Sequence, residues 1–335
     1  MAISHGIPLR RFWRRVGAIL LAIVTATTVT IAGCVQTAAT PLRVGTSLWT
    51  GFAHLYLAES LGYFQDSPVR FVEYPSSHDM TQAFLNGEIE AAAVTMGDAL
   101  SMAEKGIDVK VVLVFDSSNG ADVILAKPTI ENLQALKGKQ VGVEASVLGT
   151  FTLTRALAKV GLTLEAVQIA PLGISEQEAA FREGNVDALV TYEPVRSRLL
   201  ASGAKQIFDS SQIPGEIVDI LVVRSDALKN QTATVQFLID QWFRAYAQAK
   251  KDPQDAAKRV APRLELSPEA YQKSLAGIHF PTLEENRQLL SQGDSTLLEG
   301  ARQLIQVMLD RKLLTQPVDP SVLLDDQFVQ NGQSW

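Results

Sequence analysis

The sequence repeats one phrase at a constant spacing, and this duplication limits the possible fold more than any other feature. Residues 84–91, FLNGEIEA, return as residues 181–188, FREGNVDA, and Val44-Gly45 returns as Val141-Gly142, each 97 positions later. In both copies the pattern is typical of a helix that ends at a glycine and is followed by a buried strand. Several matches in one register indicate that the chain contains two similar lobes.

Short apolar runs alternate with helical patterns in the repeated region. In the first copy we expect strands at 42–46, 69–74, 91–95 and 109–115, and helices at 53–64, 80–85 and 99–105. Strands that are apolar on both faces and separated by helices are typical of a parallel sheet covered on both sides. Two further apolar runs, 121–126 and 217–224, are expected to cross between the lobes, and from about Ser225 the pattern is helical only. The sequence therefore predicts an α/β protein of two lobes with two hinge crossings and a helical C-terminal part.

The first 33 residues are typical of an export signal. Four arginines between positions 10 and 15 precede an uncharged run at 16–33. The run ends in Ile31-Ala32-Gly33-Cys34, which resembles the lipobox of bacterial lipoproteins, in which the cysteine receives a lipid and becomes the first residue after cleavage. The alternatives are a retained membrane helix and an ordinary Cys34 thiol. We expect a periplasmic or extracytoplasmic protein that is anchored to a membrane by lipid on Cys34, the single cysteine of the chain.

The charge and length of the remaining chain narrow the class of protein. Without the signal, 302 residues carry 26 basic and 36 acidic side chains, a net charge of −10. Such a body has no basic surface for nucleic acid. The length suggests about two domains at roughly 150 residues each, in a monomer. The expected division is a signal at 1–33, a tether at 34–41, lobe one at 42–122 and 223–320, lobe two at 123–222, and a C-terminal tail at 321–335.

The loops that follow the predicted strands form the candidate site, because ligands of open parallel sheets bind beyond the carboxyl ends of the strands. These loops hold small hydroxyls, glycines and two aromatic residues, which is the chemistry of a small-molecule site. The candidate ligand-binding residues are Trp49, Ser77, Asp98, Asp116, Asp122, Glu144, Ser146, Tyr192, Glu193 and Asp219. For several of them a purely structural role is open: Trp49 and Tyr192 could pack inward. Ser77, Asp98 and Ser146 could cap the helices that follow them.

Acidic residues outnumber basic ones in these loops. Against the carboxylates of the candidate set, the same region offers Arg196 and His78. Carboxylates buried together require raised pKa values or a cation between them. Aromatic faces would add cation–π attraction. A cationic or zwitterionic amine or amidine is therefore favoured as the ligand, although an anion could still bind at helix N-termini.

Several motifs of the chain also occur together in one family. They are LRVG at 42–45, AESLGYF at 58–64, FLNGEIEA at 84–91 and YEP at 192–194, after the lipobox. Over residues 42–320 the chain resembles solute-binding proteins of the nitrate/sulfonate/taurine/bicarbonate ABC-importer group, which includes a thiamine-pyrimidine-synthase-like branch. The resemblance implies a two-lobed periplasmic-binding-protein type II fold. It also implies a cleft that closes over a small solute, with an ABC permease and its ATPase as partners. The family default is nitrate, sulfonate or taurine, and the shortage of Lys and Arg at the predicted cleft departs from that.

The same fold also hosts enzymes, so the residues must decide whether catalysis is expected. A pyrimidine synthase of the related branch uses a cysteine-rich motif and a histidine, whereas this chain has one cysteine. No two of its histidines have metal-ligand spacing. Ser77-His78-Asp79 holds the residue types of a catalytic triad, but sequence neighbours do not face one another as triad members do. We expect no enzyme activity, no catalytic residues, no metal and no cofactor. A pyrimidine-synthase-like enzyme and a periplasmic ligand sensor are the alternative functions.

Overall fold

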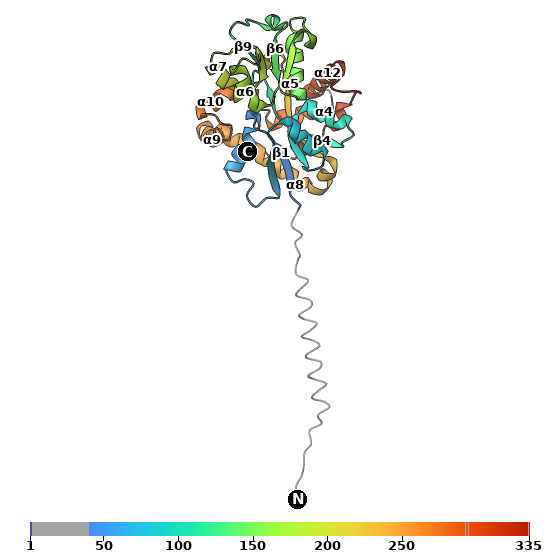
Figure 1. Cartoon of the computed structure of the whole chain (residues 1–335). Coiled ribbons are helices and arrows are strands. Elements are labelled where there is room, and N and C mark those ends of the chain that lie inside the picture. Colours follow the sequence, from blue (N-terminus) through green and yellow to red (C-terminus); the bar gives the residue numbers. More distant parts are fainter. Residues whose placement is uncertain (2–39, 292, 294, 334) are drawn as a thin grey trace. The chain divides into compact units, whose positions relative to one another are not determined.

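Two sheets with the same strand order form the framework of the protein (Figure 1). The computed structural model describes residues 1, 40–291, 293, 295–333 and 335, so the predicted signal and Cys34 lie outside the described residues. Starting from equivalent edges, the first sheet runs β11-β4-β10-β3-β1-β2 and the second runs β9-β5-β8-β6-β7. Apart from the short β11, each position in one sheet has its counterpart in the other, which confirms the two-lobed prediction.

Lobe one contains the first sheet and the helices between its strands. Its strands are β1 (Leu42–Thr46), β2 (Val69–Glu73), β3 (Ala91–Thr95), β4 (Val109–Ser118), β10 (Val218–Arg224) and β11 (Ile278–His279), and its helices are α2 (Ala53–Ser60), α3 (Ser77–Leu85) and α4 (Met96–Glu104). Strands β2, β1 and β3 pair in parallel, as expected from their apolar faces.

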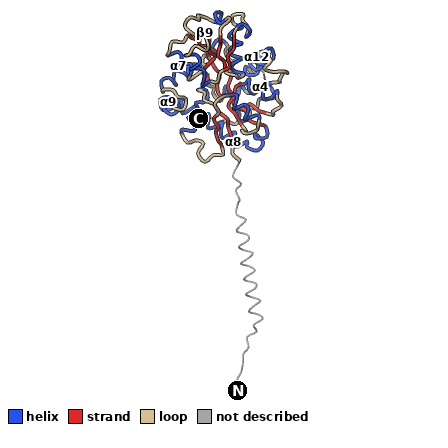
Figure 2. Tube along the Cα trace, viewed as in Figure 1, coloured by secondary structure: helices blue, strands red, loops and turns tan. Residues whose placement is uncertain are grey.

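Lobe two repeats this arrangement. Its strands are β5 (Val123–Ala126), β6 (Gln140–Val143), β7 (Gln168–Pro171), β8 (Ala188–Thr191) and β9 (Lys205–Asp209), and its helices are α5 (Val147–Ala158), α6 (Ile174–Arg182) and α7 (Val195–Ala201). In both lobes the strands form a central layer with helices around it (Figure 2).

The repeated phrase has the same physical role in both lobes. Gly87 and Gly184 follow a helix with φ of +75° and +82°, a backbone conformation that favours glycine. In each lobe, the acidic residue three positions after this glycine accepts a hydrogen bond from the backbone of a neighbouring strand, β1 in lobe one and β6 in lobe two. Arg43 N donates to Glu90 at 2.8 Å, and Gln140 N donates to Asp187 at 3.1 Å. The phrase is therefore a helix stop joined to a clamp on the neighbouring strand.

The crossing strands run antiparallel to their neighbours. Strand β5 pairs antiparallel with β8 and β9, and β10 pairs antiparallel with β3 and β4. Because β10 belongs to the sheet of lobe one, the second crossing precedes Val218. The predicted boundary between residues 222 and 223 is therefore a few residues too late.

The C-terminal part is helical, as predicted, and covers lobe one. Its helices are α8 (Ser225–Lys251), α9 (Pro253–Val260), α10 (Pro268–Ser274), α11 (Leu283–Leu289), α12 (Thr296–Asp310) and α13 (Gln327–Gln330). The predicted C-terminal tail at 321–335 packs on lobe one, because Asp325 N donates to Val111 O of β4 at 3.0 Å and Phe328 is buried. No helix in the described residues is long and apolar enough to span a membrane.

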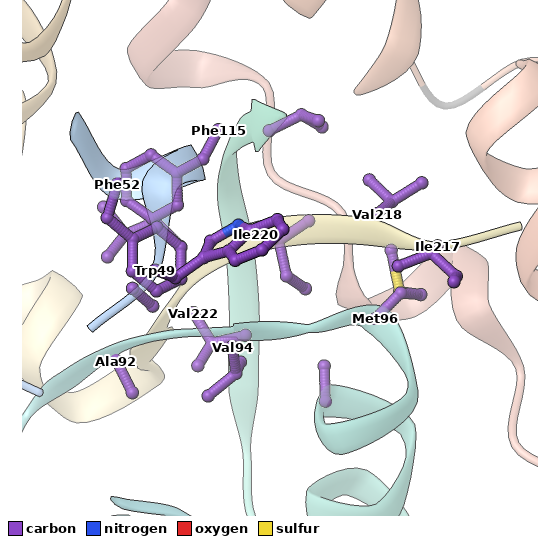
Figure 3. Packing of buried hydrophobic residues seen from close by; sticks show 14 of the residues in the cluster. Trp49, Phe52, Ala92, Val94, Met96, Phe115, Ile217, Val218, Ile220 and Val222 are labelled. Carbon is purple, nitrogen blue, oxygen red and sulfur yellow. The ribbon is translucent and has the colours of Figure 1, made fainter. Parts of the chain in front are cut away.

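The main core lies along β3, β4 and β10, which are rich in Val and Ala. Figure 3 shows Trp49, Phe52 and Ile220 among the side chains of this cluster. Trp49 follows β1, so the core reaches the carboxyl ends of the strands. The candidate site is therefore built directly on the main core of lobe one.

Candidate ligand-binding site

The strand ends of the two lobes face each other across a small cavity, here called the inner cavity. Its wall comes from both lobes: Ser47, Trp49, Phe52, Ser77, Ala93, Val94, Thr95, Asp122, Leu148, Tyr192 and Asp219. Its volume is about 20 Å³, which is room for about one water molecule. The lobes also touch beside it, because a Cβ on Gly97 of α4 would lie 2.7 Å from Val147 of α5. The cleft is closed in this structure.

Trp49 joins the two lobes at this cavity. Its side chain is 7% exposed, and its indole N–H donates to Asp116 Oδ2 at 3.3 Å. Its ring meets Tyr192 of lobe two edge to face, with centroids 5.4 Å apart. A Cβ on Gly51 would lie 2.0 Å from Asp116 Oδ2, so a glycine is needed where the chain passes this contact. Trp49 thus packs into the core and lines the cavity at once.

Five buried carboxyls gather around the inner cavity. They are Asp98, Asp116, Asp122, Glu144 and Asp219, each 7% exposed or less. Strand pairing places Asp219 on β10 directly opposite Asp116 on β4 and Thr95 on β3. Asp122 and Asp219 line the cavity, and Asp98, Asp116 and Glu144 each interact electrostatically with one of these two. The structure thus brings together five of the six candidate carboxyls, all except Glu193.

Burial raises the pKa values of this group. Loss of solvation raises the pKa of Asp122 to about 6, although Arg196 opposes the shift. Burial also raises the pKa of Asp116, and it raises the pKa of Asp219 further because the Asp116 carboxylate opposes its ionisation. Burial likewise raises the pKa of Glu144, with Asp98 and Asp122 adding repulsion. At neutral pH the closed cleft must hold protons or a cation.

Two carboxylate oxygens of the group lack a hydrogen-bond donor. Asp116 Oδ1 and Glu144 Oε1 are fully buried and accept no hydrogen bond from the described residues. Two basic side chains favour the ionised form of these carboxyls: Arg196 acts on Asp122, and His78 acts on Asp98. Buried acceptors without donors are costly, so the site has spare capacity for a ligand that donates.

The helix caps differ in part from the sequence-based expectation. Ser146, a candidate ligand-binding residue, caps α5, since its Oγ accepts from Gly149 N at 3.1 Å; this is the structural role left open for it. Ser77 does not cap α3: the cap is Ser76, and Ser77 is the first helical residue and lines the inner cavity. Asp98 does not occupy the N-cap of α4 either, because Thr95 does, and the Asp98 carboxylate closes a capping box with Thr95.

Glu193, the last of the candidate residues, lies outside the inner cavity, and so does the Ser-His-Asp run beyond Ser77. The Glu193 carboxylate accepts hydrogen bonds from Ser197 N at 3.1 Å and Ser197 Oγ at 2.9 Å, so it already has partners. His78 and Asp79 are exposed, and Asp79 bonds to Ser76. The Ser-His-Asp run is therefore no triad, and among the described residues no group of His, Cys, Asp and Glu could hold a metal ion.

A larger cavity, here called the outer cavity, lies next to the inner one and was missed by the sequence analysis as a unit. Its volume is about 490 Å³, and Ser47 and Tyr192 line both cavities. Its other lining residues are Leu48, Glu73, Tyr74, Pro75, Ser76, Ile174, Ser175, Glu193, Pro194, Val195, Arg198, Leu264 and Glu265. It is bounded by both lobes and by the helical C-terminal part, so it lies at the mouth of the cleft.

One further cavity is larger still but lacks free charge. It has a volume of about 1010 Å³ and lies along α11. Its acidic residues are paired, Glu284 with Arg287 at 3.2 Å and Glu285 with His279 at 3.3 Å. The uncompensated carboxyls are found at the inner cavity instead.

Two lobes with a closed cleft at their facing strand ends define the periplasmic-binding-protein type II fold, and the comparison with solved structures agrees. The chain belongs to the NMT1-like family, whose model matches residues 36–265.

Individual relatives are similar over part or most of the chain. A protein of Escherichia coli (strain K12), whose provisional name assigns it aliphatic sulfonates, is 28% identical over 170 residues, which is 50% of this chain and 53% of that protein. The match thus spans about half the length of this relative. The alkanesulfonate-binding protein SsuA from Xanthomonas axonopodis pv. citri, bound to MOPS, has a TM-score of 0.70 at 20% identity and covers 85% of this chain and 96% of that one.

An enzyme shares the fold as well. The desulfurization enzyme DSZB has a TM-score of 0.65 at 18% identity and covers 87% of this chain and 98% of its own. The architecture alone is therefore compatible with both binding and catalysis. The function must come from the residues in the cleft.

Proposed function

We propose that this chain is the solute-binding component of an ABC importer, which captures a small polar solute between its lobes and delivers it to a membrane permease. The two-lobe cleft and the family membership support this proposal, as do the names of the sequence relatives, all of which describe binding proteins. The alternative of an enzyme is weaker, because the hydroxyls that meet a carboxylate around the inner cavity already cap helices. Ser146 Oγ donates to Glu144 at 3.2 Å and caps α5, and Thr95 Oγ1 donates to Asp98 within the capping box of α4.

The solute is a cation in this proposal. The single observation that carries it is the group of five buried carboxyls around the inner cavity, against which the described residues place Arg196 beside Asp122 and His78 beside Asp98. A cationic solute would supply the missing positive charge and the missing donors. The rings of Trp49 and Tyr192 would add cation–π attraction.

Transport would use an open–closed equilibrium. In the closed cleft the inner cavity has room for about one water molecule. The lobes must therefore separate for a solute to enter and close again around it. The two crossings, before β5 and before β10, are the natural hinges. The permease would then recognise the closed form. Lipid on Cys34 would hold the protein at the outer face of a membrane.

A sulfonate is the second candidate, favoured by the E. coli relative and the SsuA structure. A receptor-docking sensor would bind ligand in the same cleft. A permease gene beside this one would support transport, and a receptor gene in its place would support sensing.

The deciding experiment is a thermal-shift panel on the exported protein with amines, guanidines, sulfonates, nitrate and bicarbonate. A specific ligand at 100 times its dissociation constant adds about 2.7 kcal/mol to the free energy of unfolding. We expect one or more amines to stabilise the protein. This stabilisation should be lost in Asp219→Asn and kept in Asp187→Asn, a control variant outside the cleft. Stabilisation by oxyanions alone would reject the cation.

A further inference from the structure

The geometry points to a narrower solute class, given the proposed solute-binding function: a primary amine with a single ammonium head and an uncharged, largely apolar body. The ammonium would occupy the inner cavity and the body would fill the outer cavity. The inference rests on the size of one cavity, the lining of the other and the pairing of charges between them.

The inner cavity matches an ammonium group in size and in partners. Its volume of about 20 Å³ holds one water-sized group. An ammonium is a compact point charge of this size, whereas a guanidinium is a broad plane with five N–H donors. The Asp219 carboxyl, which lines the cavity, is 6% exposed and pairs with another carboxyl, that of Asp116. The buried carboxyls thus offer acceptors to one small cation.

The outer cavity matches a carbon body. Its volume of about 490 Å³ falls in the usual range for small-molecule pockets. Apolar side chains come from all three of its borders, such as Leu48 from lobe one, Ile174 from lobe two and Leu264 from the C-terminal part. Ser47 and Tyr192 line both cavities, so a head in the inner cavity and a body in the outer cavity would be adjacent parts of one ligand.

The charges of the outer cavity are already used. Arg198 pairs with Glu265 at 2.7 Å and with Glu178 at 3.4 Å. Glu73 pairs with Arg263 at 3.0 Å.

The Glu193 carboxylate of the same cavity accepts two hydrogen bonds from Ser197. A carboxylate or sulfonate on the body could pair with a cation here only by breaking one of these ion pairs. A second ammonium could likewise pair with an anion only by breaking one of them. The pairing therefore selects a monocation over a zwitterion or a diamine.

The test is calorimetric titration of the exported protein with a matched ligand set. The set is phenethylamine, methylamine, phenylalanine, 1,4-diaminobutane and 2-phenylethanesulfonate, which differ from phenethylamine in head, body or charge. We expect phenethylamine to bind at least tenfold more tightly than each of the others. A methylamine, phenylalanine or diaminobutane affinity equal to that of phenethylamine would overturn this inference and leave the cationic function standing. Binding of the sulfonate with no binding of any amine would overturn both, as would no binding by any member.

A variant pair separates the body contact from general damage. Ile174→Gln places an amide in the outer cavity, and Ile169→Gln makes the same change at a position on β7 that is 45% exposed and outside both cavities. We expect phenethylamine affinity to fall on the order of tenfold in Ile174→Gln and to be unchanged in Ile169→Gln. An equal effect in both variants, or none in either, would contradict the placement of the body.

Discussion

Asp122→Asn should stabilise the ligand-free protein at high pH. Asp122 is 3% exposed, and burial raises its pKa from 3.8 to about 6. Its charge therefore opposes folding: the cost is absent below about pH 4, grows as the pH rises to 6, and is complete above that. Each tenfold change in proton affinity is worth about 1.36 kcal/mol, so the full cost is about 3 kcal/mol. An asparagine is neutral at every pH and removes this cost.

The assay is urea unfolding of wild type and variant between pH 4 and pH 8, followed by tryptophan fluorescence. We expect similar stability near pH 4. Above pH 6 we expect a gain for the variant of at most about 3 kcal/mol, because the full cost belongs to the closed form and opening of the cleft relieves part of it. Glu285→Gln is a control of opposite sign. The Thr282 N–H donates to the Glu285 carboxylate and lowers its pKa, so the charge stabilises above about pH 4.5 and its removal should destabilise there. Equal stabilities of wild type and Asp122→Asn at pH 8 would refute the burial of this charge in the ligand-free protein.

Three further changes test the fold and the anchor. Gly51→Ala should cost about 2–4 kcal/mol of unfolding free energy in urea titration, because the new Cβ collides with the Trp49–Asp116 contact. Gly293→Ala, with nothing within 4 Å of its Cβ, should cost little. Phe328→Ala should cost about 3–5 kcal/mol in the same assay, since the ring is 1% exposed against lobe one; a negligible loss would show that the C-terminal segment is not packed. Cys34→Ser should yield an unlipidated protein in the soluble fraction, checked by intact mass, and unchanged membrane retention would contradict the anchor.

The repeated architecture could be predicted because its signals are local. A glycine with positive φ, an acidic clamp and the start of an apolar strand lie within eight residues. Each copy can therefore be recognised from its own sequence, without knowledge of the rest of the chain. The direction of β10 and the docking of 324–329 on β4 could not be predicted in this way. Both depend on which strand edge is free once the whole sheet has formed, and that is not a property of the segment itself.

The candidate site was predictable to a similar extent. The rule that ligands bind at strand ends identified Trp49, Ser77 and Tyr192 on the wall of the inner cavity, and the predicted crossing strands supplied Asp122 and Asp219. The caps were less predictable: Ser76 and Ser77 are adjacent and chemically identical, so sequence cannot say which of them begins the helix. Residues of the outer cavity, such as Ile174 and Leu264, come from distant segments and carry no polar signature.

The closed cleft and its carboxyls together predict that acid favours closure of the ligand-free protein. Closure buries Asp122, whose pKa becomes about 6, and Asp116, whose pKa becomes about 8, so the closed form takes up protons that an open, hydrated cleft would not hold. Small-angle scattering should therefore give a smaller radius of gyration at pH 5 than at pH 8 without ligand. A bound cation should give the compact form at both pH values. In the double variant Asp122→Asn, Asp219→Asn the pH response should shrink, since two of the carboxyls no longer titrate. A radius that is independent of both pH and ligand would mean that these lobes do not open.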